Sequence, residues 1–390
     1  MTLSSRQRIV VQREIALLKG SGNDPKRLRL LQKQYRYAGN QTCAGDGLCA
    51  TSCPMSINTG DLTHVIRQAE FPRGSIWYAI GNRTAKHFST VKAFLRGILA
   101  LANAAHTVLG TKIMTLLAKA MHAIHLPLWT PAMPRPFRNR KSKIENQKSK
   151  KVVYFPSCIN QTMGLEKASP EKLPLMNEIV ALLHKAGYEV IFPKNMKNLC
   201  CGTIWESKGM PDIADRKSAE LEAALYEASE MGKNPVLCDQ SPCLYRMRQK
   251  MGETGEMGRD PLLKLYEPVE FITTFLLDRL EFTPTDFPVA IHITCTMRKM
   301  GLEKQIIELA KRCSTNVLLP EEVGCCGFAG DKGFTHPEVN AYALRKLRPQ
   351  IEKTGSLRGY SNSRTCEIGL TTNSKIPYQS IVYLVNQCTK

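Results

Sequence analysis

Long uncharged apolar runs are missing from this 390-residue chain. The longest of note is the 15-residue run 97–111, between Arg96 and Lys112. A membrane-spanning helix needs roughly 20 apolar residues. No apolar run follows the charged start of the chain either, so we expect no secretory signal peptide. The sequence therefore predicts a cytoplasmic protein with reduced thiols, whose clustered cysteines ligate metal rather than form disulfides.

A dinucleotide or flavin fingerprint is also missing. The nearest pattern, Gly327-x2-Gly330-x2-Gly333, does not have the G-x-G-x-x-G spacing of dinucleotide-binding loops. No serine–histidine–aspartate set and no pair of carboxylates at useful spacing stands out. We therefore predict no catalytic residue and no flavin site in this chain.

Acidic residues are scarce in the first third of the chain. Residues 1–151 hold 25 lysines and arginines against six acidic residues, whereas 152–390 hold 29 against 28. The basic run 135–151 has Phe137 as its only aromatic residue, and single-strand binding surfaces combine charge with several stacking aromatics. We interpret this run as a linker and expect no nucleic-acid partner.

Helical periodicity dominates the N-terminal third. Apolar spacing predicts helices over 5–36, with a break at 20–23, and over 61–125. The second stretch is basic and amphipathic. Two interpretations of its apolar residues stay open: they form the core, or they lie on an anionic membrane surface. The residues concerned are Phe94, Leu95, Ile98 and Leu99.

After the linker, short β-rich runs alternate with helical stretches, which predicts α/β units. The runs are 152–155, 188–192 and 235–237. We therefore predict an α+β protein with an α-helical ferredoxin-type domain over 1–134 and a basic linker over 135–151. Two repeated α/β modules follow, over 152–285 and 286–390.

The first of three cysteine constellations is Cys43-x2-Asp46-x2-Cys49-x3-Cys53-Pro54. Bacterial ferredoxins use C-x2-C-x2-C-x3-C-P around a [4Fe–4S] cluster, and here Asp46 stands in the place of the second thiolate. We predict that these four side chains hold a [4Fe–4S] cluster; a zinc loop and buried structural cysteines are the alternatives. The last cysteine of such a run ligates the other cluster in two-cluster ferredoxins. A companion run is therefore expected on another polypeptide or on a preceding portion.

The other two constellations repeat the same landmarks in the same order. Each copy has C-x4-M-G, then Cys-Cys-Gly, then Lys-Gly, then a last cysteine. Matched landmarks in one order indicate two copies of one module. The cysteines are Cys158, Cys200, Cys201 and Cys243 in the first copy, and Cys295, Cys325, Cys326 and Cys366 in the second.

Four thiolates suffice for a [4Fe–4S] cluster or for tetrahedral zinc. We predict an iron–sulfur cluster in each module, with zinc in one module, the second above all, as the alternative. Cys238 is a candidate fifth thiolate, and Cys313 is expected in the core. Gly202 and Gly327 are expected to permit the close backbone approach that a cluster needs. His292, three residues before Cys295, is a candidate hydrogen-bond donor near the ligands.

These motifs resemble a known family. The cysteine sets of the two modules are similar to the paired CCG domains found in heterodisulfide reductase and in the iron–sulfur subunit of anaerobic glycerol-3-phosphate dehydrogenase. Longer motifs beginning at Cys43, Cys325 and Ser361 resemble more closely the C-terminal iron–sulfur half of FAD-linked, cytochrome-type D-lactate dehydrogenases. The resemblance covers essentially the whole chain.

The resemblance implies electron transfer. In that family an FAD domain and a first ferredoxin motif precede this half, and neither is visible here, so FAD is expected only on a partner subunit or domain. Electrons from D-lactate or a similar D-2-hydroxy acid would reach a quinone or cytochrome, with peripheral contact at the inner face of the plasma membrane.

Two alternatives to this role remain. One is a zinc-stabilised scaffold without redox activity, and the other is a thiol/disulfide redox subunit of the heterodisulfide-reductase type. Relatives often end each module in C-x2-C, where this chain has Gln240 and Ser363. The resemblance therefore argues against a five-thiolate, non-cubane cluster.

Overall fold

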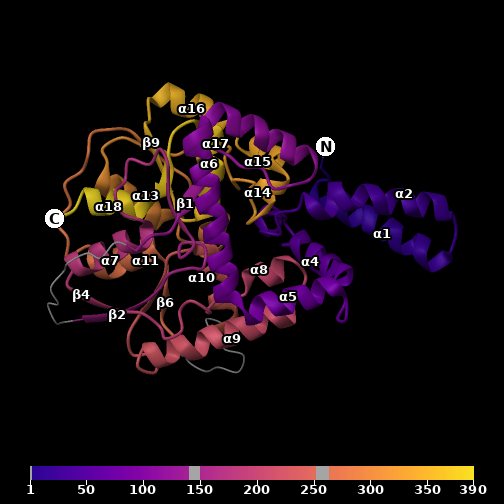
Figure 1. The fold of residues 1–390 in the computed structure, drawn as a ribbon, viewed down its shortest axis with the longest axis horizontal. Coiled ribbons are helices and arrows are strands. Elements are labelled where there is room, and N and C mark those ends of the chain that lie inside the picture. The colour runs from indigo at the N-terminus through magenta and orange to yellow at the C-terminus, as the bar shows by residue number, and fades with distance from the viewer. Residues whose placement is uncertain (1, 140–149, 252–262) are drawn as a thin grey trace.

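The computed structural model describes residues 2–139, 150–251 and 263–390. Residues 140–149 of the predicted linker and 252–262 of the predicted first module lie outside the described residues. An N-terminal helical region precedes two parallel sheets, each flanked by helices (Figure 1). The mixed α/β architecture with a helical N-terminal region is therefore confirmed.

The N-terminal region consists of helices on either side of the cysteine loop. Ser4 caps the first helix through a reciprocal pair of bonds with Gln7, and Gly22 ends it in a left-handed conformation. This confirms the predicted break, and the first two helices project from the body as an arm (Figure 1). The helices are α1 (Ser5–Ser21), α2 (Pro25–Tyr35), a π-helix (Arg36–Gln41), α3 (Leu48–Thr51), α4 (Thr59–Glu70), α5 (Ile76–Lys86) and α6 (Phe88–Ala123).

Helix α6 bends at Gly110, whose φ of 73° and ψ of 169° are not helical. Leu99 is buried, whereas Phe94, Leu95 and Ile98 are exposed, so the core interpretation is wrong for those three residues. In the described part of the chain, α6 is the one helix long and apolar enough to cross a membrane, and 11% of its most apolar window is buried. Length and composition alone are weak evidence for a span.

The first module is a four-stranded parallel sheet in the order β4-β2-β5-β6. Strands appear where the β-rich runs predicted them, although the first begins two residues earlier, at Lys150. Its elements are β2 (Lys150–Phe155), α7 (Leu175–Lys185), β4 (Tyr188–Ile191), α8 (Thr203–Ser207), α9 (Pro211–Ala228), β5 (Val236–Cys238), α10 (Ser241–Met251) and β6 (Leu265–Tyr266). Helix α11 (Pro268–Phe271) and a π-helix (Ile272–Leu276) lead to the second module.

The second module has the same topology, with parallel strands in the order β8-β7-β9-β10. Matching strand order and direction confirm the internal repeat that the cysteine landmarks predicted. Its elements are β7 (Val289–Ile291), α12 (Cys295–Lys299), α13 (Glu303–Cys313), β8 (Val317–Leu318), α14 (Lys332–Thr335), α15 (Pro337–Ala343), α16 (Leu347–Thr354), β9 (Arg358–Ser361), α17 (Arg364–Ser374), β10 (Tyr378–Ser380) and α18 (Ile381–Gln387).

One hydrophobic core runs through both modules. It contains Val152 and Tyr154 of the first sheet together with Ile291 and Tyr360 of the second. The short strand β1 (Pro134–Pro136), inside the predicted linker, pairs antiparallel with β3 (Met163–Glu166). The two repeats therefore pack as one unit, since burying apolar surface between them stabilises both.

Candidate metal centres

The thiols of both modules follow parallel strands. Cys158 comes after β2, the pair Cys200–Cys201 after β4, and Cys243 lies in the first turn of α10 after β5. The second module repeats this placement after β7, β8 and β9. The carboxyl ends of parallel strands meet at one edge of a sheet, which is where such folds place their ligands.

In the first module the four thiols form a continuous chain of contacts. Cys200 hydrogen-bonds with Cys158 and with Cys201, and Cys201 also bonds with Cys243. The bonds from Cys158 and Cys201, together with burial, raise the pKa of Cys200 well above its ordinary value. Buried thiols this close cannot all ionise unless a cation compensates their charge.

The second module repeats the chain of contacts. Cys295 hydrogen-bonds with Cys325, and Cys326 Sγ lies 3.0 Å from Cys366 Sγ. The bond with Cys325, burial and the charge of Asp46 raise the pKa of Cys295. The structure thus brings together the thiols that the sequence grouped in this module.

The glycine after each cysteine pair serves packing. Gly202 and Gly327 have φ of 91° and 71°, which L side chains rarely adopt. A side chain at Gly202 would meet the Ala214 carbonyl of α9 at 2.3 Å, and one at Gly327 would meet the Val339 carbonyl of α15 at 2.9 Å. The sequence analysis expected a cluster to approach these glycines, whereas the close approach is made by helices α9 and α15.

His292 lies beside the second cysteine pair. Its Nε2 lies 3.2 Å from the Gly324 carbonyl and its Nδ1 3.1 Å from the Ser361 hydroxyl. Burial lowers the pKa of His292 to about 4, so the ring is neutral at pH 7 and donates through one nitrogen only. The ring positions the loop that carries Cys325 and Cys326 and bonds with no ligand thiol.

The N-terminal cysteine loop has a different environment. Cys43 is buried, whereas Cys49 and Cys53 are half-buried. The Cys49 sulfur accepts from Thr59 N at 3.3 Å, and although burial alone would raise the pKa of Cys49, this bond and that of the Thr59 hydroxyl lower it. A thiolate is therefore favoured at Cys49.

Asp46 lies against the second module. In the described ranges, the only group of three such ligand atoms within 4.8 Å of one another comprises Asp46, Cys295 and Cys325. Cys43, Cys49 and Cys53 do not form such a group. The sequence placed Asp46 with the loop cysteines and gave no signal for this long-range approach.

Two basic residues that the sequence analysis did not identify fix the cysteine loop in place. The guanidinium of Arg67 donates to the Cys43 carbonyl at 2.8 Å and to the Ser207 carbonyl of the first module at 3.1 Å. Lys332 of the second module donates to the Gln41 carbonyl at 2.5 Å. The loop is therefore held between both modules, next to positive charge that suits an anionic cluster.

The predicted spare cysteines have other contacts. Cys238 is buried in β5 and its sulfur donates to the Gln240 carbonyl at 3.8 Å. Cys313 is a core residue, as predicted, and hydrogen-bonds with Cys388.

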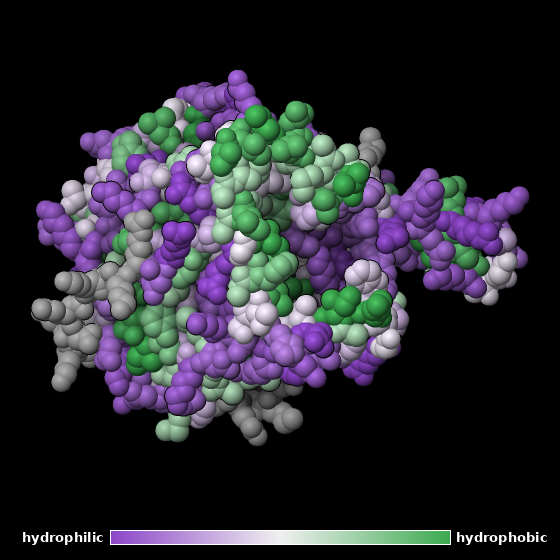
Figure 2. Space-filling model, in the orientation of Figure 1, coloured by the Kyte–Doolittle hydropathy of each residue, from purple (hydrophilic) through white to green (hydrophobic). Residues whose placement is uncertain are grey.

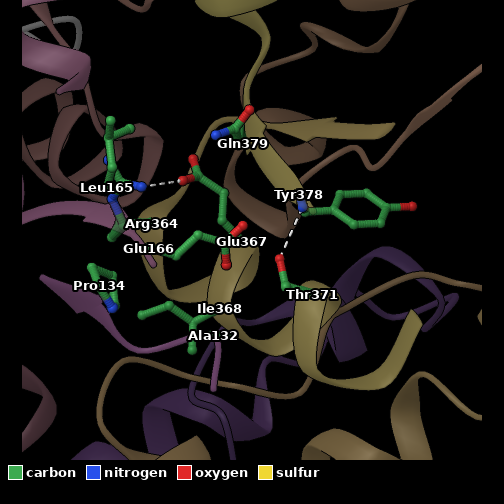
Figure 3. A pocket seen from close by; sticks show the side chains of 10 residues that line it. All are labelled: Ala132, Pro134, Leu165, Glu166, Arg364, Glu367, Ile368, Thr371, Tyr378 and Gln379. Atoms are coloured by element: carbon green, nitrogen blue, oxygen red, sulfur yellow. Dashed lines mark hydrogen bonds and ion pairs between the residues drawn. The ribbon is translucent and has the colours of Figure 1, made fainter. Parts of the chain in front are cut away.

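A separate pocket lies at α17 and contains no cysteine among its lining residues. Arg364 pairs there with Glu367 at 3.0 Å (Figure 3). Burial raises the pKa of Glu367 and of Glu166 to about 7. Arg364 Nε also donates to Asn160 of the first module at 3.2 Å, so this cluster joins the modules.

The donor chemistry of both modules suits iron–sulfur clusters or zinc. Soft thiolates select these metals, and the thiols are gathered by rigid strand ends. The residues present therefore fit such a group: Cys158, Cys200, Cys201 and Cys243 in one module, and Cys295, Cys325, Cys326 and Cys366 in the other.

Comparison with known proteins agrees with the repeat. The model of the CCG cysteine-rich domain matches residues 152–248 and 289–371, so the chain carries two CCG cysteine-rich domains, which are typical of iron–sulfur subunits.

Two named relatives show distant homology. The chain is 22% identical over 379 residues to a subunit of the anaerobic glycerol-3-phosphate dehydrogenase of Escherichia coli K12, covering 95% of this chain and 91% of that protein. It is 24% identical over 218 residues to lactate utilization protein A 1 of Bacillus mycoides, covering 53% of this chain and 82% of that protein.

Proposed function

We propose that this chain is the iron–sulfur electron-transfer subunit of a dehydrogenase whose flavin lies on a partner polypeptide or domain. The observation that carries the proposal is the double convergence of four thiols at the carboxyl edges of two equivalent sheets. Clusters held there would supply one-electron redox chemistry. The chain itself does no bond-breaking chemistry in this proposal.

The relatives support a hydroxyl-bearing substrate on the partner. One is named a subunit of a glycerol-3-phosphate dehydrogenase and the other a lactate utilization protein. Together with the motifs at Cys43, Cys325 and Ser361, they favour a partner that oxidises D-lactate or a similar D-2-hydroxy acid. A quinone or a cytochrome is the proposed electron acceptor.

The chain's own residues tune such centres by burial and charge. Cys200, Cys201 and Cys326 are almost fully buried, which excludes water and oxygen from the sulfur atoms. Arg67 and Lys332 place positive charge beside the N-terminal loop. Positive charge stabilises the more reduced, more anionic state of a cluster and so raises its potential.

Helices α5 and α6 supply the proposed membrane contact. Figure 2 shows apolar side chains gathered along these helices. No acidic residue occurs between Glu70 and Glu145, whereas basic residues recur through this stretch. Apolar area together with uncompensated positive charge favours an anionic lipid surface. The exposed apolar residues include Trp77, Phe94, Ile98, Leu101, Val108, Leu116 and Met121.

Anaerobic purification followed by metal and sulfide analysis tests the redox proposal. We expect iron and acid-labile sulfide sufficient for at least two clusters, and a brown visible spectrum that dithionite bleaches. A colourless protein that contains zinc alone would support the scaffold alternative instead. A second readout is reduction of the oxidised subunit by a flavodehydrogenase in the presence of D-lactate.

A further inference from the structure

The N-terminal loop contributes an oxygen ligand candidate to a sulfur site formed by residues far away in the sequence. Asp46 offers a carboxylate oxygen, and Cys295 and Cys325 offer sulfurs, all within 4.8 Å of one another and all half-buried. Asp46 precedes the short helix α3, whereas Cys295 opens α12 and Cys325 follows β8.

These separations suit one coordination sphere. Two thiolates on one tetrahedral ion lie about 3.8 Å apart, given metal–sulfur bonds of about 2.3 Å. Thiolates bound to separate irons of a cubane lie farther apart, because the cluster itself stands between them. We propose that Asp46, Cys295 and Cys325 ligate the same metal ion, with Asp46 supplied by the N-terminal region to the second CCG module.

The local charges favour a cation at this point. One carboxylate and two thiolates would repel one another across a half-buried space, and the nearby ammonium of Lys299 supplies a single positive charge. A side chain at Gly47 would approach the Lys299 nitrogen to 2.6 Å, and that nitrogen also lies 4.7 Å from the centre of the Tyr245 ring. A divalent or trivalent ion would neutralise the rest.

The backbone of the loop is shaped for the approach. Gly45 and Gly47, on either side of Asp46, both have positive φ, of 66° and 69°. A side chain at Gly47 would collide with Lys299, and one at Gly45 would lie 3.1 Å from His64 Nε2. The sequence Gly-Asp-Gly therefore lets the carboxylate reach the second module without steric hindrance from its neighbours.

The shared ion ties metal loading to docking of the N-terminal region. Its ligands come from two regions of the chain that meet only in the folded protein, so binding free energy contributes to their association. The ion is iron within a cluster or a single zinc. Only the assignment as iron rests on the proposed function, because carboxylate and thiolate ligands suit both metals.

Full-length protein and its variants test the shared ion by metal analysis. Asp46→Asn and Cys295→Ser should each lower the metal content by the same equivalent, and the double variant should lose no more than either one. Non-additive effects of this kind mark groups that act on one ion. Asp24→Asn is the matched control, since Asp24 caps α2 through Arg27 N and asparagine caps equally well; its metal content should be unchanged.

X-ray absorption at the metal edge gives a second readout. The wild-type spectrum should contain an oxygen shell near 2.0 Å, roughly the length of a zinc–carboxylate bond, beside the sulfur shell. Asp46→Cys should retain the metal and replace that oxygen by sulfur, which also shows that loss in Asp46→Asn is not a folding defect.

Other outcomes would overturn the shared ion. Additive losses for Asp46→Asn and Cys295→Ser, combined with non-additive losses for Asp46→Asn and Cys49→Ser, would return Asp46 to a cluster of its own loop. Unchanged metal in Asp46→Asn would remove Asp46 from any site. The proposed electron transfer would survive both results. A zinc-only protein that behaves as expected in the double variant would instead retain the shared ion and end the electron-transfer proposal.

Discussion

Gln240 donates its side-chain amide to the Ser363 hydroxyl at 2.9 Å and so joins the two modules at equivalent positions of the repeat. Each residue lies three positions before the last cysteine of its module. The Gln240 oxygen also accepts from Arg364 N at 3.1 Å. The positions where related CCG domains carry an extra cysteine are thus occupied here by a buried polar contact between modules.

Gln240→Ala should lower the free energy of unfolding by about 1–3 kcal/mol, because it leaves buried polar groups without partners. Denaturant unfolding measures this loss, and Gln249→Ala, on the exposed side of the same helix, should change stability by less than about 0.5 kcal/mol. Metal content should stay at the wild-type level. A fall in metal content at unchanged stability would instead place Gln240 in the metal site.

Cys201→Ser and Cys326→Ser should each remove the metal of one module and leave that of the other. Serine oxygen is a harder, weaker ligand for these metals than thiolate. Metal analysis and electron paramagnetic resonance of the reduced protein measure the loss. Cys313→Ala is the control, since Cys313 is a core residue bonded to Cys388. Equal metal loss in that control would contradict the assigned ligand sets.

Glu267→Gln should reduce the loss of stability as pH rises. Burial raises the pKa of Glu267 to about 8, above the ordinary value of about 4.5, so its folded-state contribution is fully present below pH 4.5 and is lost as pH rises through 8. The slope is at most about 1.4 kcal/mol per pH unit. Thermal unfolding at pH 5 to 8 should therefore show the variant gaining on the wild type. Parallel profiles would show that Glu267 ionises normally.

Arg67→Lys should loosen the N-terminal cysteine loop, because an ammonium cannot reproduce the forked contacts to the Cys43, Asn40 and Ser207 carbonyls. We expect a stability loss of about 2 kcal/mol or more and faster limited proteolysis between residues 36 and 58. Arg73→Lys is the control, since the Arg73 side chain is 80% exposed. Equal protection of the loop in both variants would contradict this role for Arg67.

Phe94→Glu combined with Ile98→Glu should weaken binding to vesicles of anionic phospholipid at least tenfold. Each substitution removes roughly 1.5–3 kcal/mol of apolar burial and adds a repelled charge. Vesicle sedimentation measures the change, and Leu357→Glu, at an exposed leucine of the second module, should have no effect. Equal binding by all three proteins, or no binding by the wild type, would end the proposed membrane contact.

Much of the architecture followed from the order of residues. Repeated cysteine landmarks predicted two equivalent modules, because a duplicated sequence folds into a duplicated unit, and both sheets have the same strand order. Helical periodicity and the break near Gly20 predicted the arm of α1 and α2. The thiol groupings Cys158–Cys243 and Cys295–Cys366 also followed, since each grouping lies within one module and its cysteines follow parallel strands.

Only the tertiary structure decided which modules and loops meet. Asp46 lies with Cys295 and Cys325, and Gln240 bonds with Ser363, although nothing near these residues in the sequence marks such contacts. The exposure of Phe94 and Ile98 beside the buried Leu99 depended likewise on which face of α6 the modules cover. Local spacing determines elements, whereas contacts between distant residues depend on how whole elements pack.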